Sequence, residues 1–119
     1  MAIDLKGINP KNKLGIYLQI EWMYWKPLWD FVGFHLLNLG PSTFISLQKN
    51  GGTIIKFLAD MMRTEITIAF QNLELNTNYY KQQIQEIKTR HGKNYIFDWD
   101  VLKNFLNFIS NCEGFEIHY

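Results

Sequence analysis

Apolar side chains recur at spacings of three and four residues over long stretches of the chain. The stretch from Thr53 to Phe70 predicts an amphipathic helix with Thr53 as its N-cap and with Ile55 and Met61 in its apolar stripe. Its second half is rich in β-branched residues, so conversion into a strand near Phe70 is the alternative. The run from Leu28 to Leu37 is apolar almost all round, and Pro27 suits a first helical turn. We expect a largely buried helix there, ended by the Asn-Leu-Gly-Pro sequence of residues 38–41.

Two further helices are expected in the C-terminal part of the chain. Residues 78–90 carry a narrow apolar stripe, which predicts a surface helix capped by Asn76 or Thr77 and ended at Gly92. Asp98 is placed to cap a last helix, whose wide apolar face runs from Val101 to Cys112. Gly114 is expected to end that helix.

Alternating apolar and polar positions mark two candidate strands. Residues 15–24 alternate loosely and favour a short strand, with the start of a helix as the alternative. The tail at 115–119 also alternates, and we expect it to pair with residues 16–20. Met1 to Gly15 is interpreted as an irregular arm because turn-forming residues cluster there. Residues 42–49 are ambiguous, and residues 50–52, Asn-Gly-Gly, indicate a turn.

These elements predict one domain over residues 1–119 in the mainly α class. About four helices would surround an aromatic core, with room for a two-stranded sheet formed by the N-terminal arm and the C-terminal tail. Aromatic residues make up 16% of the chain, so rings should fill much of that core.

Three tryptophans share a spacing that has two interpretations. Trp22, Trp25 and Trp29 would line one helical face if the helix begins before Pro27. Core packing is the favoured interpretation. A binding surface is the alternative, because tryptophan is enriched at the anchor points of protein interfaces.

Charge and cysteine content indicate where the protein works. Twelve basic and eleven acidic side chains give a formal charge of +1, which supplies no net attraction to nucleic acid or to an anionic membrane. Cys112 is the single cysteine, so an intramolecular disulfide is excluded and a reducing compartment is favoured. Neither a signal peptide nor a run of about 18 apolar residues is evident. We expect a cytoplasmic protein that does not enter membranes.

No catalytic residue, cofactor or metal is predicted. His35, His91 and His118 are not at metal-ligand spacing from one another or from Cys112. His35 lies in an apolar run and is interpreted as a core or edge histidine, and Cys112 as a core thiol.

The surface offers a few candidate contacts for another macromolecule. Lysines and Arg90 between Lys81 and Lys93 are interpreted as a solvated helix face rather than a nucleic-acid site, because Glu86 and several glutamines separate them. Tyrosines at the start of the predicted surface helix and an acidic excess near the C-terminus are better candidates for contact with a protein. The candidate partner-binding residues are Tyr79, Tyr80, Asp98, Asp100, Glu113 and Glu116.

Four short motifs are similar to a family of small, uncharacterised bacterial proteins. The first two are N-x-x-G-x-Y at residues 12–17 and W-x-P-L-W-x-F at residues 25–31. The others are V-x-x-x-F-x-x-F at residues 101–108 and G-F-x-I at residues 114–117. The resemblance implies a bacterial, single-domain protein and carries no established activity.

The leading hypothesis is therefore a small protein-binding domain, most concretely an immunity protein that neutralises a cognate bacterial toxin. A small domain without a reaction centre suits stoichiometric binding, and a homodimer is compatible with the sequence. One alternative is an enzyme whose fold gathers residues such as Asp30, His35 and Glu113. The other is a nucleic-acid-binding accessory factor that uses the basic residues from Lys81 to Lys93.

Overall fold

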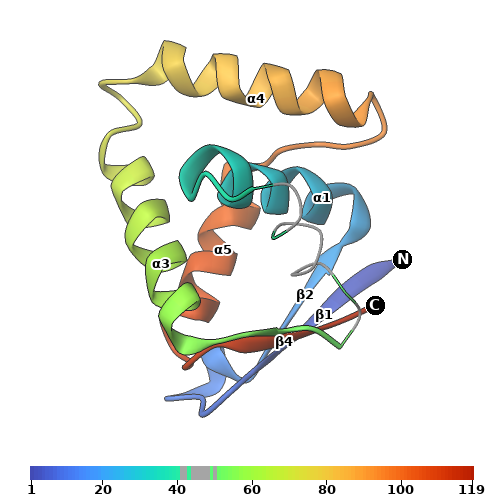
Figure 1. The fold of residues 1–119 in the computed structure, drawn as a ribbon, viewed down its shortest axis with the longest axis vertical. Helices are drawn as coiled ribbons and strands as arrows, with labels where there is room; N and C mark the ends of the chain where they lie inside the picture. The colour runs from blue at the N-terminus through green and yellow to red at the C-terminus, as the bar shows by residue number, and fades with distance from the viewer. Residues whose placement is uncertain (41–42, 44–48, 50) are drawn as a thin grey trace.

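A four-stranded antiparallel sheet with helices packed on one face forms the protein (Figure 1). The computed structural model describes residues 1–40, 43, 49 and 51–119. The strands are β1 (Ala2–Gly7), β2 (Tyr17–Glu21), β3 (Thr53–Ile54) and β4 (Phe115–His118), in the spatial order β2-β1-β4-β3. The first and last strands of the chain therefore lie side by side in the middle of the sheet, and the two termini end close together.

The α-helices of the described residues are α1 (Trp22–Asp30), α3 (Lys56–Gln71), α4 (Thr77–His91) and α5 (Trp99–Ile109). A π-helix, η2 (Phe31–Leu36), continues α1, and a single 3-10 turn, η1 (Lys13–Gly15), precedes β2. The mainly α expectation is confirmed in this coarse form, while the sheet has twice the expected number of strands. No described helix is long and apolar enough to cross a membrane.

Side-chain alternation fixes the two faces of the sheet. Ile3, Leu5, Phe115 and Ile117 are fully buried on the inner face, and Leu5 lies opposite Ile117 in the register. Because successive residues of a strand point to opposite faces, the residues between them face outward. The outer face is polar and carries residues such as Lys6.

Two predictions for the sheet are wrong. Residues 2–7 of the predicted irregular arm form β1, and the C-terminal strand does not pair with residues 16–20. The expected pairing between the N-terminal arm and the C-terminal tail is confirmed in the form of β1 with β4, and β4 also pairs with β3. The turn-forming residues of the arm lie after β1, where they build its connection to β2. Gly7 is needed at the end of β1, because a Cβ atom there would lie 1.7 Å from the carbonyl oxygen of Gly15.

Helix α1 begins earlier than Pro27 and contains it. Proline has no N–H, so the carbonyl of Met23 loses its partner within the helix. The N–H of Ile96 donates to that carbonyl at 3.0 Å, so the segment before α5 supplies the missing bond. The strand interpretation of residues 15–24 is confirmed for β2, and the helical alternative applies from Trp22 onward.

Helix α3 begins at Lys56, so the prediction of Thr53 as its N-cap is wrong. Thr53 and Ile54 form β3 against β4, with Ile54 opposite Phe115, because this pairing buries Ile54 completely. Gly114 precedes that pair with a φ of 101°, and a Cβ atom there would lie 2.3 Å from the carbonyl oxygen of Ile54. Helix α3 continues to Gln71, so its β-branched second half stays helical. The predicted turn at Asn50 and the ambiguous segment from Ser42 to Lys49 fall largely outside the described residues.

The last two helices match the prediction more closely. Asn76 caps α4 by position, and Gly92 ends it with a φ of 90°. Asp98 caps α5 through its carboxylate, which accepts hydrogen bonds from the N–H groups of Asp100 at 2.7 Å and Val101 at 3.3 Å. Helix α5 ends at Ile109, before the predicted end at Gly114.

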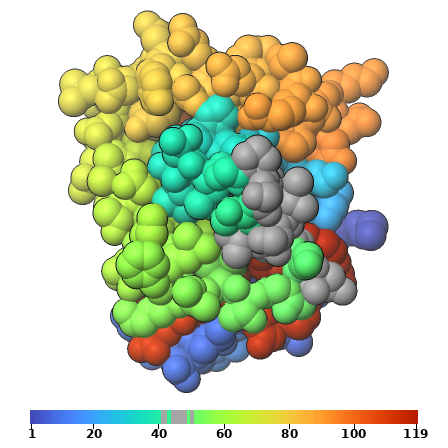
Figure 2. All heavy atoms as spheres, viewed as in Figure 1, coloured from blue at the N-terminus to red at the C-terminus, as the bar shows by residue number. Residues whose placement is uncertain are grey.

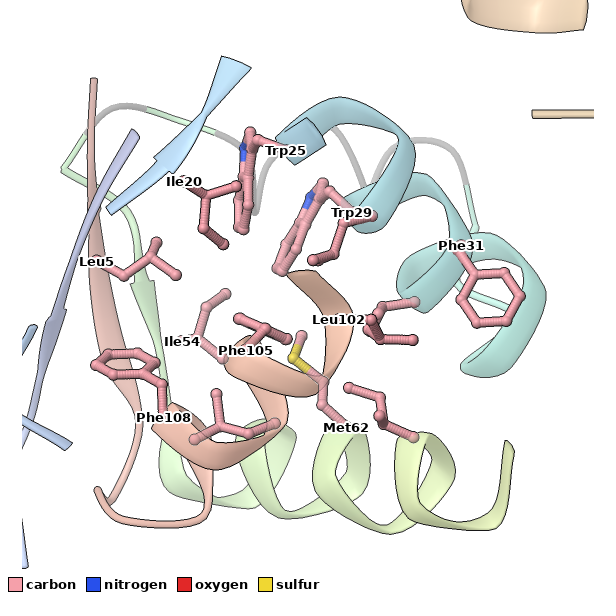
Figure 3. Packing of buried hydrophobic residues seen from close by; sticks show 14 of the residues in the cluster. Leu5, Ile20, Trp25, Trp29, Phe31, Ile54, Met62, Leu102, Phe105 and Phe108 are labelled. Carbon is pink, nitrogen blue, oxygen red and sulfur yellow. The ribbon is translucent and has the colours of Figure 1, made fainter. Parts of the chain in front are cut away.

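Aromatic rings join the helices to the sheet (Figure 3). Trp25 and Trp29 of α1 stack at 5.0 Å, and Trp25 meets Phe105 of α5 edge-on at 6.2 Å. Phe105 in turn meets Phe115 of β4 at 5.7 Å. Trp25 and Trp29 are 2% and 1% exposed, which confirms the core interpretation for both, whereas Trp22 is only partly buried.

Candidate functional site

A buried carboxylate stands at the end of α1. Asp30 is 1% exposed, and its neighbours in the chain, Trp29 and Phe31, belong to the hydrophobic core. A buried charge is stable only when opposite charges and hydrogen bonds replace its water. Arg90 near the end of α4 supplies both, since its Nε donates to Oδ2 and its Nη2 to Oδ1, each at 2.9 Å. This two-point geometry fixes the end of α4 against the end of α1.

Two histidines complete the cluster around Asp30. Nε2 of His91 lies 2.7 Å from Oδ2 of Asp30, and Nε2 of His35 lies 4.0 Å from Oδ1. His35 also contacts Arg90, with 3.1 Å between its Nε2 and Nη2 of the arginine. We call Asp30, His35, Arg90 and His91 the Asp30 cluster.

The hydrogen bonds of His35 define its tautomer. Arginine only donates, so Nε2 of His35 must accept from Arg90 and the ring proton lies on Nδ1. Nδ1 then donates to the side-chain oxygen of Gln83. Burial lowers the pKa of His35, and the charge of Arg90 lowers it further, while Asp30 and Glu86 oppose the shift. His35 is therefore a neutral imidazole at neutral pH.

The stability of the protein should fall as the pH drops below the ordinary histidine pKa of 6.5. The folded state holds His35 at a lower pKa, so below 6.5 the unfolded state binds more protons and gains stability. The loss begins near 6.5 and stops once the pH is below the folded pKa. Chemical unfolding measured from pH 7.5 to 5 checks this. His35→Gln should unfold with a weaker pH dependence over that range, and an unchanged slope would contradict the assignment.

The Asp30 cluster has the composition of an acid-base site but the contacts of a structural one. Both carboxylate oxygens of Asp30 accept hydrogen bonds from Arg90, and the side chain is only 2% accessible. Among the described residues, His35 and His91 form hydrogen bonds with Gln83, Arg90 and Asp30, and none of these bonds involves a hydroxyl or a thiol. The cluster therefore ties α4 and the π-helix to α1.

The enzyme hypothesis named three residues, and the structure gathers two of them. Asp30 and His35 meet in the cluster, whereas Glu113 lies after α5 and accepts a hydrogen bond from Asn9 at 3.2 Å. Sequence reasoning did not link Arg90 and His91 to this pair. A signal was present, because a carboxylate inside an apolar helix requires a cation, and the chain has only two arginines, Arg63 and Arg90.

Cys112 is a core thiol, as expected. It is 5% exposed, and its Sγ lies 3.4 Å from the carbonyl oxygen of Phe108. Burial raises the pKa of Cys112, so the reactive thiolate form is disfavoured. In the part of the chain that the structure describes, no three His, Cys, Asp or Glu side chains gather as metal ligands.

The predicted partner-binding residues fall into two separate regions. Tyr79 and Tyr80 of α4 lie near the start of α5, because the ring of Tyr80 meets Trp99 at 5.9 Å. Asp98 and Asp100 flank Trp99, so these four residues share one end of the molecule.

The remaining two acidic residues lie beyond the opposite end of α5. Glu116 is on the outer face of the sheet, 3.1 Å from Nε2 of His118, and Glu113 lies in the turn before β4. Tyr79 is 54% exposed, but Tyr80 is 8% exposed and packs against Phe31 and Trp99. Tyr80 therefore contributes to the core, and Asp98 is engaged as a helix cap.

An exposed apolar surface at the start of α3 was not among the predicted sites. Ile55, Phe57 and Met61 are 61%, 73% and 38% exposed, and we call them the α3 apolar face. Phe57 and Met61 line a hollow of about 440 Å³ together with Leu36 and Leu37 from the end of the π-helix. Asp60, Thr64 and Glu65 complete its walls. In Figure 2, α3 is drawn in yellow-green and lies at the molecular surface on the face turned to the viewer.

Sequence periodicity placed Ile55 and Met61 on the buried stripe of the predicted helix. The helix instead buries Ala59, Met62, Ile66 and Ala69. Because α3 begins at Lys56 and not at Thr53, Ile55 precedes the helix and faces solvent, as does Phe57 in the first turn. Phe57 never fitted the apolar stripe, and that mismatch is the signal that could have identified this surface.

One member of the predicted solvated basic face is engaged in an ion pair. Arg90 binds Asp30, so its charge is compensated, while Lys81, Lys88 and Lys93 remain exposed.

Comparison of the chain with known proteins gives no assignment to a family. No protein-family model, curated protein or solved structure matches it.

Proposed function

We propose that the protein is a small binding domain that acts on another protein, most concretely an immunity protein that neutralises a cognate bacterial toxin in the cytoplasm. The observation that carries the proposal is the α3 apolar face with its hollow. Large apolar side chains that stay exposed beside a hollow are typical of protein interaction sites. The resemblance to small bacterial proteins supports the bacterial setting.

The state of the ionisable groups also supports binding over catalysis. The side chains of the Asp30 cluster form hydrogen bonds with one another, and Cys112 is buried as a thiol. The hollow at the α3 apolar face is lined mainly by apolar side chains, together with the carboxylates of Asp60 and Glu65. Lys56 and Arg63 lie 2.9 and 3.5 Å from the carboxylate of Asp60, which leaves Glu65 as the acidic group of the hollow without a described ion pair. Such a site suits an apolar anchor that carries a positive charge.

The experiment is co-expression with the products of adjacent genes, one at a time. We expect one of them to be toxic, to be neutralised by this protein, and to form a one-to-one complex with it when both are purified. Binding by purified components distinguishes neutralisation by contact from indirect protection. Absence of binding and of protection for every adjacent product would refute the immunity role.

An enzyme that uses Asp30 and His35 is the second candidate, because the structure brings these residues to 4.0 Å from each other. It predicts that His35→Gln abolishes function while the α3 apolar face tolerates substitution. A nucleic-acid-binding role would use the exposed lysines of α4 and predicts a gel shift that weakens with salt. The binding proposal predicts neither result.

A further inference from the structure

Among the described residues, strand β2 lies at the end of the sheet, and one of its edges has no neighbouring strand. It pairs with β1 alone in the spatial order of the strands. In an antiparallel pair, every second residue directs its N–H and C=O toward the neighbouring strand. The N–H of Gly7 donates to the carbonyl of Ile16 at 2.9 Å, and the N–H of Trp22 donates to the carbonyl of Met1 at 3.0 Å. Residues 16 and 22 therefore face β1, and so does every second residue between them. The backbone N–H and C=O groups of Leu18 and Ile20 therefore point toward β1.

The other residues of β2 direct their backbone groups away from the sheet. The N–H and C=O groups of Tyr17 and Gln19 and the N–H of Glu21 point outward, and among the described residues no backbone hydrogen bond to them is found beyond β1. The strand has no proline, and it lacks the lysine and the bulge that commonly block such edges. This edge can therefore accept another strand.

The inner side of this edge is apolar and has space beside it. Leu18 is half-buried, and Ile20 is 4% exposed. A hollow of about 170 Å³ adjoins the strand and is lined by residues of β2, α1 and α5, among them Leu18, Tyr24 and Val101. An added strand would find room there for its inward-facing side chains.

We propose that β2 pairs with β2 of a second copy of this chain, antiparallel about a twofold axis at Gln19, so that the two sheets become one. In this register Gln19 lies opposite Gln19 of the second copy. Tyr17 lies opposite Glu21, and Leu18 lies opposite Ile20. The outward-pointing backbone groups of both strands then meet, because all of them belong to the pairs that exchange hydrogen bonds.

A second copy of this chain suits the free edge of β2 because β2 is complementary to itself in this register. Leu18 and Ile20 form apolar pairs on the inner face. On the outer face Tyr17, whose hydroxyl donates to Asp4 of its own copy, lies beside Glu21, so no like charges are opposed within β2. A register centred on Glu21 would oppose like charges. Registers centred on Leu18 or Ile20 would leave part of the strand unpaired. The contact is isologous and closes after two copies, as in most homodimers.

Disulfide trapping tests the register. Directly opposed residues of a hydrogen-bonded pair have Cα atoms about 5.5 Å apart, which is within disulfide range. Gln19→Cys should form a covalent dimer under mild oxidation. Thr53→Cys, exposed on β3 at the opposite edge, is the matched control and should stay monomeric, and the native Cys112 is buried. Equal cross-linking of the two variants, or none, would overturn the proposal.

Sedimentation equilibrium tests the pairing itself. Gln19→Pro removes an N–H that faces solvent within one copy, where proline is tolerated, and blocks the central pair of the dimer. Gln19→Ala keeps the N–H and is the control. We expect the wild type and Gln19→Ala to dimerise and Gln19→Pro to weaken association at least tenfold, with unchanged circular dichroism. A wild type that stays monomeric at millimolar concentration would overturn the proposal, and so would equal association of the two folded variants.

Discussion

Phe105→Ala lowers the free energy of unfolding by about 3–5 kcal/mol, the range for truncation of a fully buried phenylalanine. Phe105 is 0% exposed and links α1 to β4 through Trp25 and Phe115. The truncation removes these ring contacts and leaves a cavity between helix and sheet. Urea unfolding followed by tryptophan fluorescence measures the change.

The matched control is the same substitution on the surface. Phe57 is 73% exposed, so Phe57→Ala should change the free energy of unfolding by less than about 0.5 kcal/mol. Similar losses for the two variants would contradict the assignment of Phe105 to the core and Phe57 to the surface.

Arg90→Met lowers the free energy of unfolding by about 2–3 kcal/mol. Removal of one partner from a buried pair leaves an uncompensated charge, which typically costs about 3–5 kcal/mol. The lower value is expected here because the Arg90 side chain is 45% accessible and His91 still contacts Asp30. Methionine keeps most of the apolar stem, so the loss reports the missing guanidinium. Urea unfolding at pH 7 measures it.

Two further variants isolate the interaction between Asp30 and Arg90. Lys88→Met removes an exposed cation from the same helix and should change stability by less than about 0.5 kcal/mol. The double variant Asp30→Asn with Arg90→Met has no buried charge to compensate. It should be more stable than the sum of the single changes predicts, by at least about 1 kcal/mol. Strictly additive losses would show that the two side chains do not stabilise each other.

Local chemistry allowed part of the fold to be predicted. Asp98 and Gly92 mark the ends of helices through hydrogen bonds and backbone angles that involve only a few neighbouring residues. Strands β1 and β3 were missed because each has little signal of its own. Ile3 and Leu5 are two apolar residues in an arm, and β3 has two residues in all. Their pairing with β4 brings together parts of the chain that are far apart in sequence.

The candidate site was less predictable than the helices. Asp30 and Arg90 are 60 residues apart, and nothing in the spacing of either shows that α4 lies across the end of α1. The α3 apolar face was hidden for another reason. A helix starting at Thr53 would bury Ile55, whereas the observed start at Lys56 leaves Ile55 exposed close to Phe57 in the chain.

We infer that structural and binding roles are divided between the Asp30 cluster and the α3 apolar face. The Asp30 cluster satisfies its own charges and fixes the relative positions of α1 and α4. The α3 apolar face has large apolar side chains in solvent, whose exposure is unfavourable for an isolated protein but favourable on contact with a partner. Recognition of a protein would use the second region and rely on the first for rigidity.

Protection of cells from the cognate toxin by two variants tests this division most directly. The double variant Phe57→Ser with Met61→Ser should stay folded and lose protection and binding, with affinity reduced at least about 30-fold if both residues are anchors of the interface. His35→Gln, equally folded at pH 7, should protect as well as the wild type. The opposite result, protection lost with His35→Gln and kept with the double variant, would contradict binding through α3 and place function in the Asp30 cluster.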